Sequence, residues 1–207
     1  MQTEIVIPQG NEWQFVEIAS KLGIKKIIFL YEFEKFNSKI EEKIESLKKS
    51  SLAVDINFGI IAENKNISQS VRYAKFITAK SCDNNRALLE NKKIRLVFGL
   101  EDNGKKDFMH QRASGLNHIM CELARKNNIA IGFSYGSLLK KTPQLTSQIM
   151  GRMTQNISLC KKYKVKTVIA SLTSNPYELR APYDVFSLFS MLGMDGDKIK
   201  EGMEFRV

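Results

Sequence analysis

Two polar loops carry basic residues where they could contact phosphate groups. The first, SYGSLLKK (134–141), follows a short apolar run and ends in Lys140 and Lys141. The second runs from Ser171 to Arg180, directly before a predicted helix. An arginine in that position is a bidentate donor, and the helix N-terminus adds free N–H groups. Both loops therefore favour contacts to a phosphate backbone. The alternative for Arg180 is a structural ion pair with Asp184, four residues further on.

The positive charge of the chain is concentrated in one region. Between His110 and Arg180 there are eleven Lys or Arg residues and two carboxylates, within a chain whose formal net charge is +10. Such a regional excess attracts polyanions, so nucleic acid is the first partner to consider. The alternative is a solvated basic face that serves solubility. Arg112 leads into another predicted helix, whereas one further group is equally explained as the outer face of a helix: Arg152, Lys161, Lys162, Lys164 and Lys166.

Residues for catalysis by the chain itself are scarce. There are two histidines, His110 and His118, and a multi-metal hydrolase would need several histidines and carboxylates at strand ends. The segment 132–136 fits the spacing of a nucleophile elbow around Ser134, but both histidines precede it, so the Asp-then-His order of that motif is missing. The sequence predicts no catalytic residue and no metal site. A stand-alone barrel phosphoesterase acting on nucleic acid remains the alternative.

The cysteines and the N-terminus indicate a cytoplasmic protein. Cys82, Cys121 and Cys160 include no C-x-x-C pair, and two of them fall in helical patterns where a free cysteine is usually a small core residue. A reducing compartment fits this usage best. The first ten residues, MQTEIVIPQG, lack the pattern of a signal peptide, and no apolar run approaches the roughly 18 residues that span a bilayer.

These residues must be positioned by an alternation of strands and helices. The β-rich runs are Ile5–Ile7, Lys26–Tyr31, Leu52–Ile61, Phe76–Ala79, Arg95–Leu100, Ile129–Phe133 and Thr167–Ala170. The helical segments are Glu12–Leu22, Ser38–Lys49, Asn84–Asn91, Ser114–Lys126, Gln144–Lys162 and Pro182–Leu192. The alternation predicts an α/β fold with a parallel sheet, and seven or more strands favour a TIM-like (β/α) barrel over an open sheet. We expect a single domain over residues 1–207, with its functional loops at the C-terminal ends of the strands.

Several helix ends carry local signals. Asn11 is expected to cap the helix that opens at Glu12, and Thr142 to cap the helix that opens at Pro143. The segment that starts at Ser114 is expected to be helical from its first residue.

An ordered set of motifs resembles a known family. The motifs are SGLNHI (114–119), IAIGFS (129–134), CKKYKV (160–165), LRAPYDVFSL (179–188) and LGM (192–194). Together they are similar to the ribonuclease P protein component 3 of archaea, the counterpart of the thirty-kilodalton subunit of the eukaryotic enzyme. The resemblance covers about 80 residues, while the first 110 match mainly in their strand–helix rhythm. One position departs from the pattern: after the last strand, Ser171-Leu172-Thr173 stands where the family often has Ser-Ser-Ala.

The resemblance implies a function and a set of partners. Members of the family fold as TIM-like barrels and support the ribonuclease P RNA, which is the catalyst that removes 5′ leaders from precursor tRNA. It implies Mg²⁺ bound by the RNA and no cofactor on the protein. It also implies a small ferredoxin-like protein partner, with two such pairs in a heterotetramer.

Beside the ribonuclease P subunit and the stand-alone phosphoesterase, a third hypothesis is a structural partner-binding protein whose basic face is incidental.

By matching position, the resemblance also names RNA-binding residues. The family's basic residues correspond to Arg112, Lys140 and Arg180, and its motif histidine corresponds to His118. We add Lys141, which adjoins Lys140 in the same loop. For His118, a packing or hydrogen-bonding role within its helix is the alternative.

Overall fold

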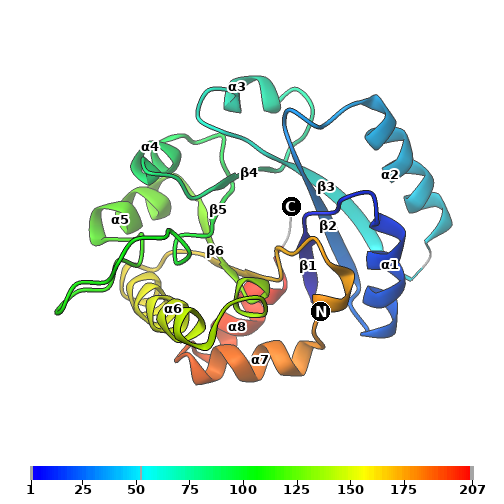
Figure 1. Cartoon of the computed structure of the whole chain (residues 1–207). Coiled ribbons are helices and arrows are strands. Elements are labelled where there is room, and N and C mark those ends of the chain that lie inside the picture. The colour runs from blue at the N-terminus through cyan, green and yellow to red at the C-terminus, as the bar shows by residue number, and fades with distance from the viewer. Residues whose placement is uncertain (1, 52, 206–207) are drawn as a thin grey trace.

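Seven short strands pair in sequence order to form one parallel sheet (Figure 1). The computed structural model describes residues 2–51 and 53–205, so the start of the predicted run Leu52–Ile61 lies outside the described residues. The strands are β1 (Thr3–Val6), β2 (Lys26–Glu32), β3 (Asp55–Ile61), β4 (Ile77–Lys80), β5 (Leu96–Phe98), β6 (Ala130–Ser134) and β7 (Thr167–Ala170). All seven agree with predicted runs to within a few residues.

The sheet curls until its first and last strands meet. Near the ends of β1 and β7, Ile7 N donates to Thr173 O at 2.9 Å, and Leu172 N donates to Ile5 O at 2.9 Å. One apolar cluster fills the inside of the resulting barrel: Ile5, Ile28, Leu30, Phe76, Leu96, Phe98, Ala130, Val168 and Ala170. The predicted TIM-like barrel is confirmed, with seven strands and near closure between the first and the last.

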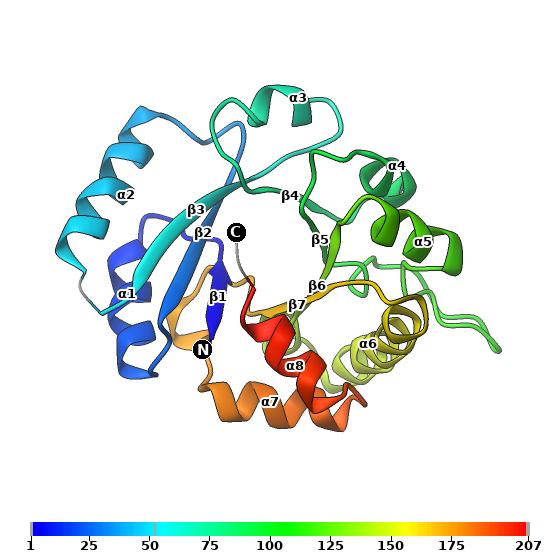
Figure 2. The same ribbon diagram turned by 180° about the vertical axis from the view of Figure 1, so that it is seen from behind.

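The helices surround the barrel as an outer ring (Figure 1). They are α1 (Glu12–Lys21), α2 (Ser38–Ser50), α3 (Ile67–Ser70), α4 (Asn85–Glu90), α5 (His118–Lys126), α6 (Pro143–Tyr163), α7 (Pro182–Met191) and α8 (Gly196–Met203), with 3₁₀ helices η1 (Gly136–Leu138) and η2 (Pro176–Glu178). Helices α3 and α8 were not predicted from the sequence. The last helix, α8, packs on β7 and α7 (Figure 2). No helix of residues 2–51 and 53–205 has both the length and the apolar character to cross a membrane.

Of the two predicted helix caps, one is wrong and the other is confirmed. Asn11 does not cap α1 with its side chain. Its Oδ1 accepts from Gln9 N, and its Nδ2 donates to Ser174 O at 3.0 Å, which ties the loop after β1 to the loop after β7. The predicted cap at Thr142 is confirmed, because its Oγ1 accepts from Leu145 N at 3.4 Å.

Helix α5 begins at His118, four residues later than predicted. Asn117 caps it, with Oδ1 accepting from Met120 N at 2.9 Å. Gly115 holds a φ of +76°, and a side chain there would overlap the backbone carbonyl of Leu100. The left-handed backbone of Gly115 therefore keeps the segment from Ser114 out of the helix. That segment instead becomes the end of a long loop after β5.

Candidate nucleic-acid interface

Three adjacent loops at the C-terminal ends of β5, β6 and β7 bring the predicted basic residues together. The loops are residues 99–117, 135–142 and 171–181. Lys141 Nζ lies 2.9 Å from Asp102 Oδ2 in the first loop, and Lys140 Nζ lies 2.8 Å from Glu178 Oε1 in the third. The middle loop is thus joined to both neighbours by ion pairs. Lys140 and Lys141 are partly neutralised where they stand, which the sequence did not predict.

The carboxylate beside Lys140 is ionised at neutral pH. Burial opposes ionisation of Glu178, but hydrogen bonds from Lys140 and Thr173 and the charge of Lys140 outweigh it and lower its pKa. The side chain of Lys140 is still 59% exposed. Because the ammonium group faces solvent while Glu178 is buried, a phosphate group can share this ammonium group with Glu178.

Arg180 is anchored to its own loop. Its Nη1 donates to Tyr177 O at 3.1 Å and to Leu179 O at 2.9 Å, so the alternative of an ion pair with Asp184 is not adopted in the described structure. Both bonds use Nη1. The Nε and Nη2 edge, the fork that suits a phosphate, has no protein partner among the described residues.

A buried network beneath Arg180 fixes the second and third loops to the barrel. Tyr135 Oη accepts from Arg180 N and donates to Glu4 Oε2 at 2.9 Å. Glu4 lies in β1, is fully buried and also accepts from Ser171 N and from Gln2 Nε2. Burial raises the pKa of Glu4, against the opposing effect of the hydrogen bonds from Ser171 and Tyr135. The network fixes the backbone N–H of Ser171 at the start of the third loop and that of Arg180 near its end, so the guanidinium group is presented from a rigid support.

Arg112 reaches across to helix α6. A methyl group on Gly151 would overlap the guanidinium group of Arg112, so this glycine leaves the space that Arg112 occupies. Arg112 remains exposed, with its charge at the surface between the first loop and α6. His118 is also exposed, at the first position of α5, which argues against the packing alternative.

Arg152 is buried, contrary to the solvated position that its place on a helix predicted. The prediction of a solvated outer face is wrong for it, because it is 1% exposed and points from α6 into the loop after β5. Its Nε donates to Asp107 Oδ1 at 2.9 Å, its Nη1 to Glu101 O at 2.8 Å and to Asn103 Oδ1, and its Nη2 to Lys105 O. One arginine thus holds four residues of the loop that carries Arg112.

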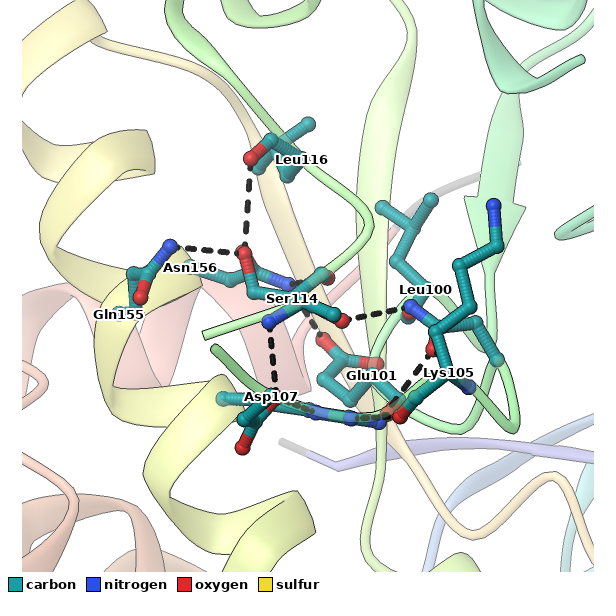
Figure 3. A network of polar contacts seen from close by, with 11 residues as sticks. Leu100, Glu101, Lys105, Asp107, Ser114, Leu116, Gln155 and Asn156 are labelled. Atoms are coloured by element: carbon teal, nitrogen blue, oxygen red, sulfur yellow. Dashed lines mark hydrogen bonds and ion pairs between the residues drawn. The ribbon is translucent and has the colours of Figure 1, made fainter. Parts of the chain in front are cut away.

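Two neighbours on α6 complete this anchor (Figure 3). Asn156 Nδ2 donates to Ser114 O at 2.9 Å and to Glu101 Oε1 at 3.3 Å, and Gln155 Nε2 donates to Ser114 Oγ at 3.0 Å. Burial raises the pKa of Glu101 to about 7, despite the hydrogen bond from Asn156. The loop after β5 is therefore fixed at both its start and its end by one face of α6.

The side chains that resembled catalytic groups have structural roles. Ser134 is buried, donates to Ser171 O at 2.7 Å and accepts from Ser137 N at 3.1 Å, so its hydroxyl group is engaged in joining two loops. Cys121 and Cys160 are buried core residues, as predicted, and Cys82 is exposed. In residues 2–51 and 53–205, no group of three or more His, Cys, Asp or Glu side chains could hold a metal ion.

A protein family matches the part of the chain that carries the second and third loops and most of the first. Residues 106–206 match the family described as RNase P subunit p30. This segment belongs to the RNase P subunit p30 family. The match contains every residue predicted to bind RNA, namely Arg112, His118, Lys140, Lys141 and Arg180. The resemblance seen in the sequence motifs is therefore confirmed.

Curated relatives of the p30 family extend the similarity toward the N-terminus. The chain is 20% identical to ribonuclease P protein component 3 of Methanothermobacter thermautotrophicus over 196 residues, which cover 89% of this chain and 77% of that protein. It is 27% identical to the Methanosarcina acetivorans protein of the same name over 119 residues, and 33% identical to the Thermococcus kodakarensis one over 91 residues. These two matches cover 46% and 41% of the relatives' own lengths, less than half in each case.

Solved structures agree with the p30 assignment at the level of the fold. A chain in the cryo-EM structure of archaeal ribonuclease P with mature tRNA superposes with a TM-score of 0.81 and 19% identity, over 97% of this chain and 87% of that one. A crystal structure of an amidohydrolase gives a TM-score of 0.58 with 7% identity, over 98% of this chain and 71% of that one. The amidohydrolase shares the barrel architecture alone.

Proposed function

We propose that this chain is a protein subunit of ribonuclease P that binds the catalytic RNA through the loops after β5, β6 and β7. The observation that carries the proposal is that four basic residues of the p30-matched segment lie on three linked loops: Arg112, Lys140, Lys141 and Arg180. Phosphate contacts from these cations supply affinity for RNA without requiring a particular base sequence. The chain itself is non-catalytic in this proposal, and the RNA cleaves the 5′ leader from precursor tRNA.

The Mg²⁺ ions that cleavage requires are bound by the RNA in this proposal, and not by the protein. Fixed positive charge on the loops stabilises the folded RNA and lowers the Mg²⁺ concentration that the RNA requires. The carboxylates beneath the loops support this division, because Glu4, Glu101 and Asp107 each accept hydrogen bonds from protein groups in the Glu4 and Arg152 networks.

The remaining partners belong to the same proposal. Precursor tRNA and a small ferredoxin-like ribonuclease P protein join the complex, with two protein pairs in a heterotetramer. We also propose that the chain works in the cytoplasm, where its three free cysteines stay reduced.

Cleavage of precursor tRNA at limiting Mg²⁺ tests the proposal. The cognate RNA and the small protein partner are assayed with and without this chain, and we expect a gain in rate that requires the RNA. Cleavage by the chain alone in added metal, with no gain for the RNA, would instead establish the stand-alone phosphoesterase.

Charge variants then test the loops. Lys140→Ala and Arg180→Ala should weaken RNA binding and reduce the slope of log K against log salt by about 0.7 to 0.9 per lost phosphate contact. Lys166→Ala is the matched control, because Lys166 is exposed and precedes β7 at the opposite end of the barrel. Equal affinities and slopes in all three variants would remove the loops from the interface.

A further inference from the structure

The loop after β5 forms an arm that projects beyond the ring of helices beside α5 and α6 (Figure 1). We define the arm as residues 104–113, GKKDFMHQRA. At its tip, Phe108 is 75% exposed and Met109 is 93% exposed, followed by the exposed His110. Two large apolar side chains side by side on a projecting tip remain in contact with water until a partner covers them.

The arm is held in shape before it meets a partner. Asp107 Oδ1 accepts from Ala113 N at 2.8 Å and from Arg152 Nε at 2.9 Å, which closes the base of the arm onto α6. Nearer the tip, Phe108 N donates to Gln111 O at 2.8 Å, and Gln111 N donates back to Phe108 O. A preformed arm loses less conformational entropy on binding than a flexible loop would.

The charges around the tip indicate the chemistry of the partner. Lys105, Lys106 and Arg112 flank the tip, and the one carboxylate of the arm, Asp107, is already engaged by Arg152. Lys105 is paired only loosely, at 3.7 Å from the fully exposed Asp83. An aromatic ring between cationic flanks matches unpaired nucleotides, since the ring stacks on a base while the cations contact phosphates on either side. An apolar pocket of a protein would complement the ring but not the flanking charges.

We propose that the arm inserts Phe108 between unpaired bases of the RNA partner, with Lys106 and Arg112 on the adjoining phosphates. The proposal rests on the proposed function, because it names where and how the same RNA is held. It adds a stacking contact to an interface otherwise made of phosphate contacts. The arm therefore selects an unpaired region of the RNA, which the cationic loops alone would not do.

Substitution of the ring is the first test. In binding to the ribonuclease P RNA, Phe108→Ala should lose about tenfold in affinity with an unchanged salt slope, because a stacked base and not a phosphate contact is lost. Phe108→Tyr should bind like the wild type. Met191→Ala is the control, since Met191 is also strongly exposed but lies at the far end of α7. Wild-type affinity for Phe108→Ala would overturn the arm proposal.

A fluorescence reporter identifies what covers the tip. The chain has one tryptophan, Trp13, so the double variant Trp13→Phe, Phe108→Trp places a single reporter on the arm. Stacking on bases should quench its emission when RNA is added. A blue shift on adding the small protein partner, with no response to RNA, would overturn the proposal in favour of a protein contact.

These outcomes separate the two proposals. If the wild-type chain neither binds the RNA nor raises its cleavage rate, the proposed function fails and the arm proposal fails with it. If the wild type binds and Phe108→Ala binds equally well, only the arm proposal fails.

Discussion

Replacing Arg152 by methionine should release the loop after β5 from helix α6. Methionine retains most of the buried stem but removes the guanidinium group, which donates to Glu101 O, Asn103 Oδ1, Lys105 O and Asp107 Oδ1. The loss removes the donor to the carbonyl oxygens of Glu101 and Lys105, whereas Asn103 and Asp107 each keep a second donor. The effect should therefore combine lower stability with a mobile arm.

The size of the effect follows from the burial of the two charges. Breaking a fully buried ion pair costs about 3 to 5 kcal/mol. Here Arg152 is buried but the side chain of Asp107 is 23% exposed, and Asp107 keeps its bond from Ala113 N. Water can thus reach the carboxylate, and we expect about 2 to 3 kcal/mol, at or below the low end of that range. For a chain of this size that corresponds to a fall in Tm of about 4 to 12 °C.

Urea denaturation and limited trypsin digestion measure the two parts of this prediction. Arg152→Met should unfold at a lower urea concentration and be cleaved faster after Lys105 and Lys106 than the wild type. Lys162→Met is the matched control, because Lys162 is an exposed basic residue near the end of the same helix. An unchanged unfolding midpoint together with an unchanged cleavage rate in Arg152→Met would refute the anchoring role.

Three further substitutions separate stability from binding. Gly151→Ala should raise the free energy of unfolding by about 0.5 to 1 kcal/mol, because alanine has the higher helix propensity. The same variant should weaken RNA binding, because the added methyl group displaces Arg112. Thermal unfolding measures the first effect and RNA titration the second. Glu101 binds a proton more tightly in the folded state, because its pKa is about 7 there against an ordinary value of 4.5. The free energy of unfolding should therefore fall as the pH rises from about 4.5 to 7 and be lowest above pH 7. The whole fall should be on the order of 3 kcal/mol. In Glu101→Gln this contribution should be lost from urea midpoints measured between pH 5 and 8, which leaves the contribution of Glu4, whose pKa burial also raises. Gly115→Ala should destabilise the chain by about 1 to 3 kcal/mol, since it strains a positive φ and meets the carbonyl of Leu100; a Tm equal to that of the wild type would contradict this.

Elements whose signals are local were predictable from the sequence. All seven strands and the longer helices followed from apolar periodicity, and the start of α6 followed from Thr142-Pro143. The four residues of α3 are too few to display a helical period, which explains why that helix was missed. The late start of α5 depended on the left-handed backbone of Gly115 against Leu100, a contact that composition does not reveal.

The basic residues of the interface were also found from the sequence, but their surroundings were not. Charge and motif order pointed to Arg112, Lys140 and Arg180, because the type of a residue and its place after a predicted strand can both be read from the sequence. Lys140 and Glu178 are 38 residues apart in two different loops, and only the pairing of β6 with β7 brings them together.

The burial of Arg152 could not be predicted from the sequence. The helical period of α6 shows which residues share a face with Arg152. It does not show which face the loop after β5 covers, so a solvated Arg152 fitted the sequence equally well. The sequence by itself determined the alternation of strands and helices, the regional charge and the family motifs, because these depend on neighbouring residues. The tertiary structure decided the closure between β1 and β7, the burial of Arg152 and the exposure of the arm. These depend on contacts between residues far apart in the chain, whose free energy arises only when the barrel is packed.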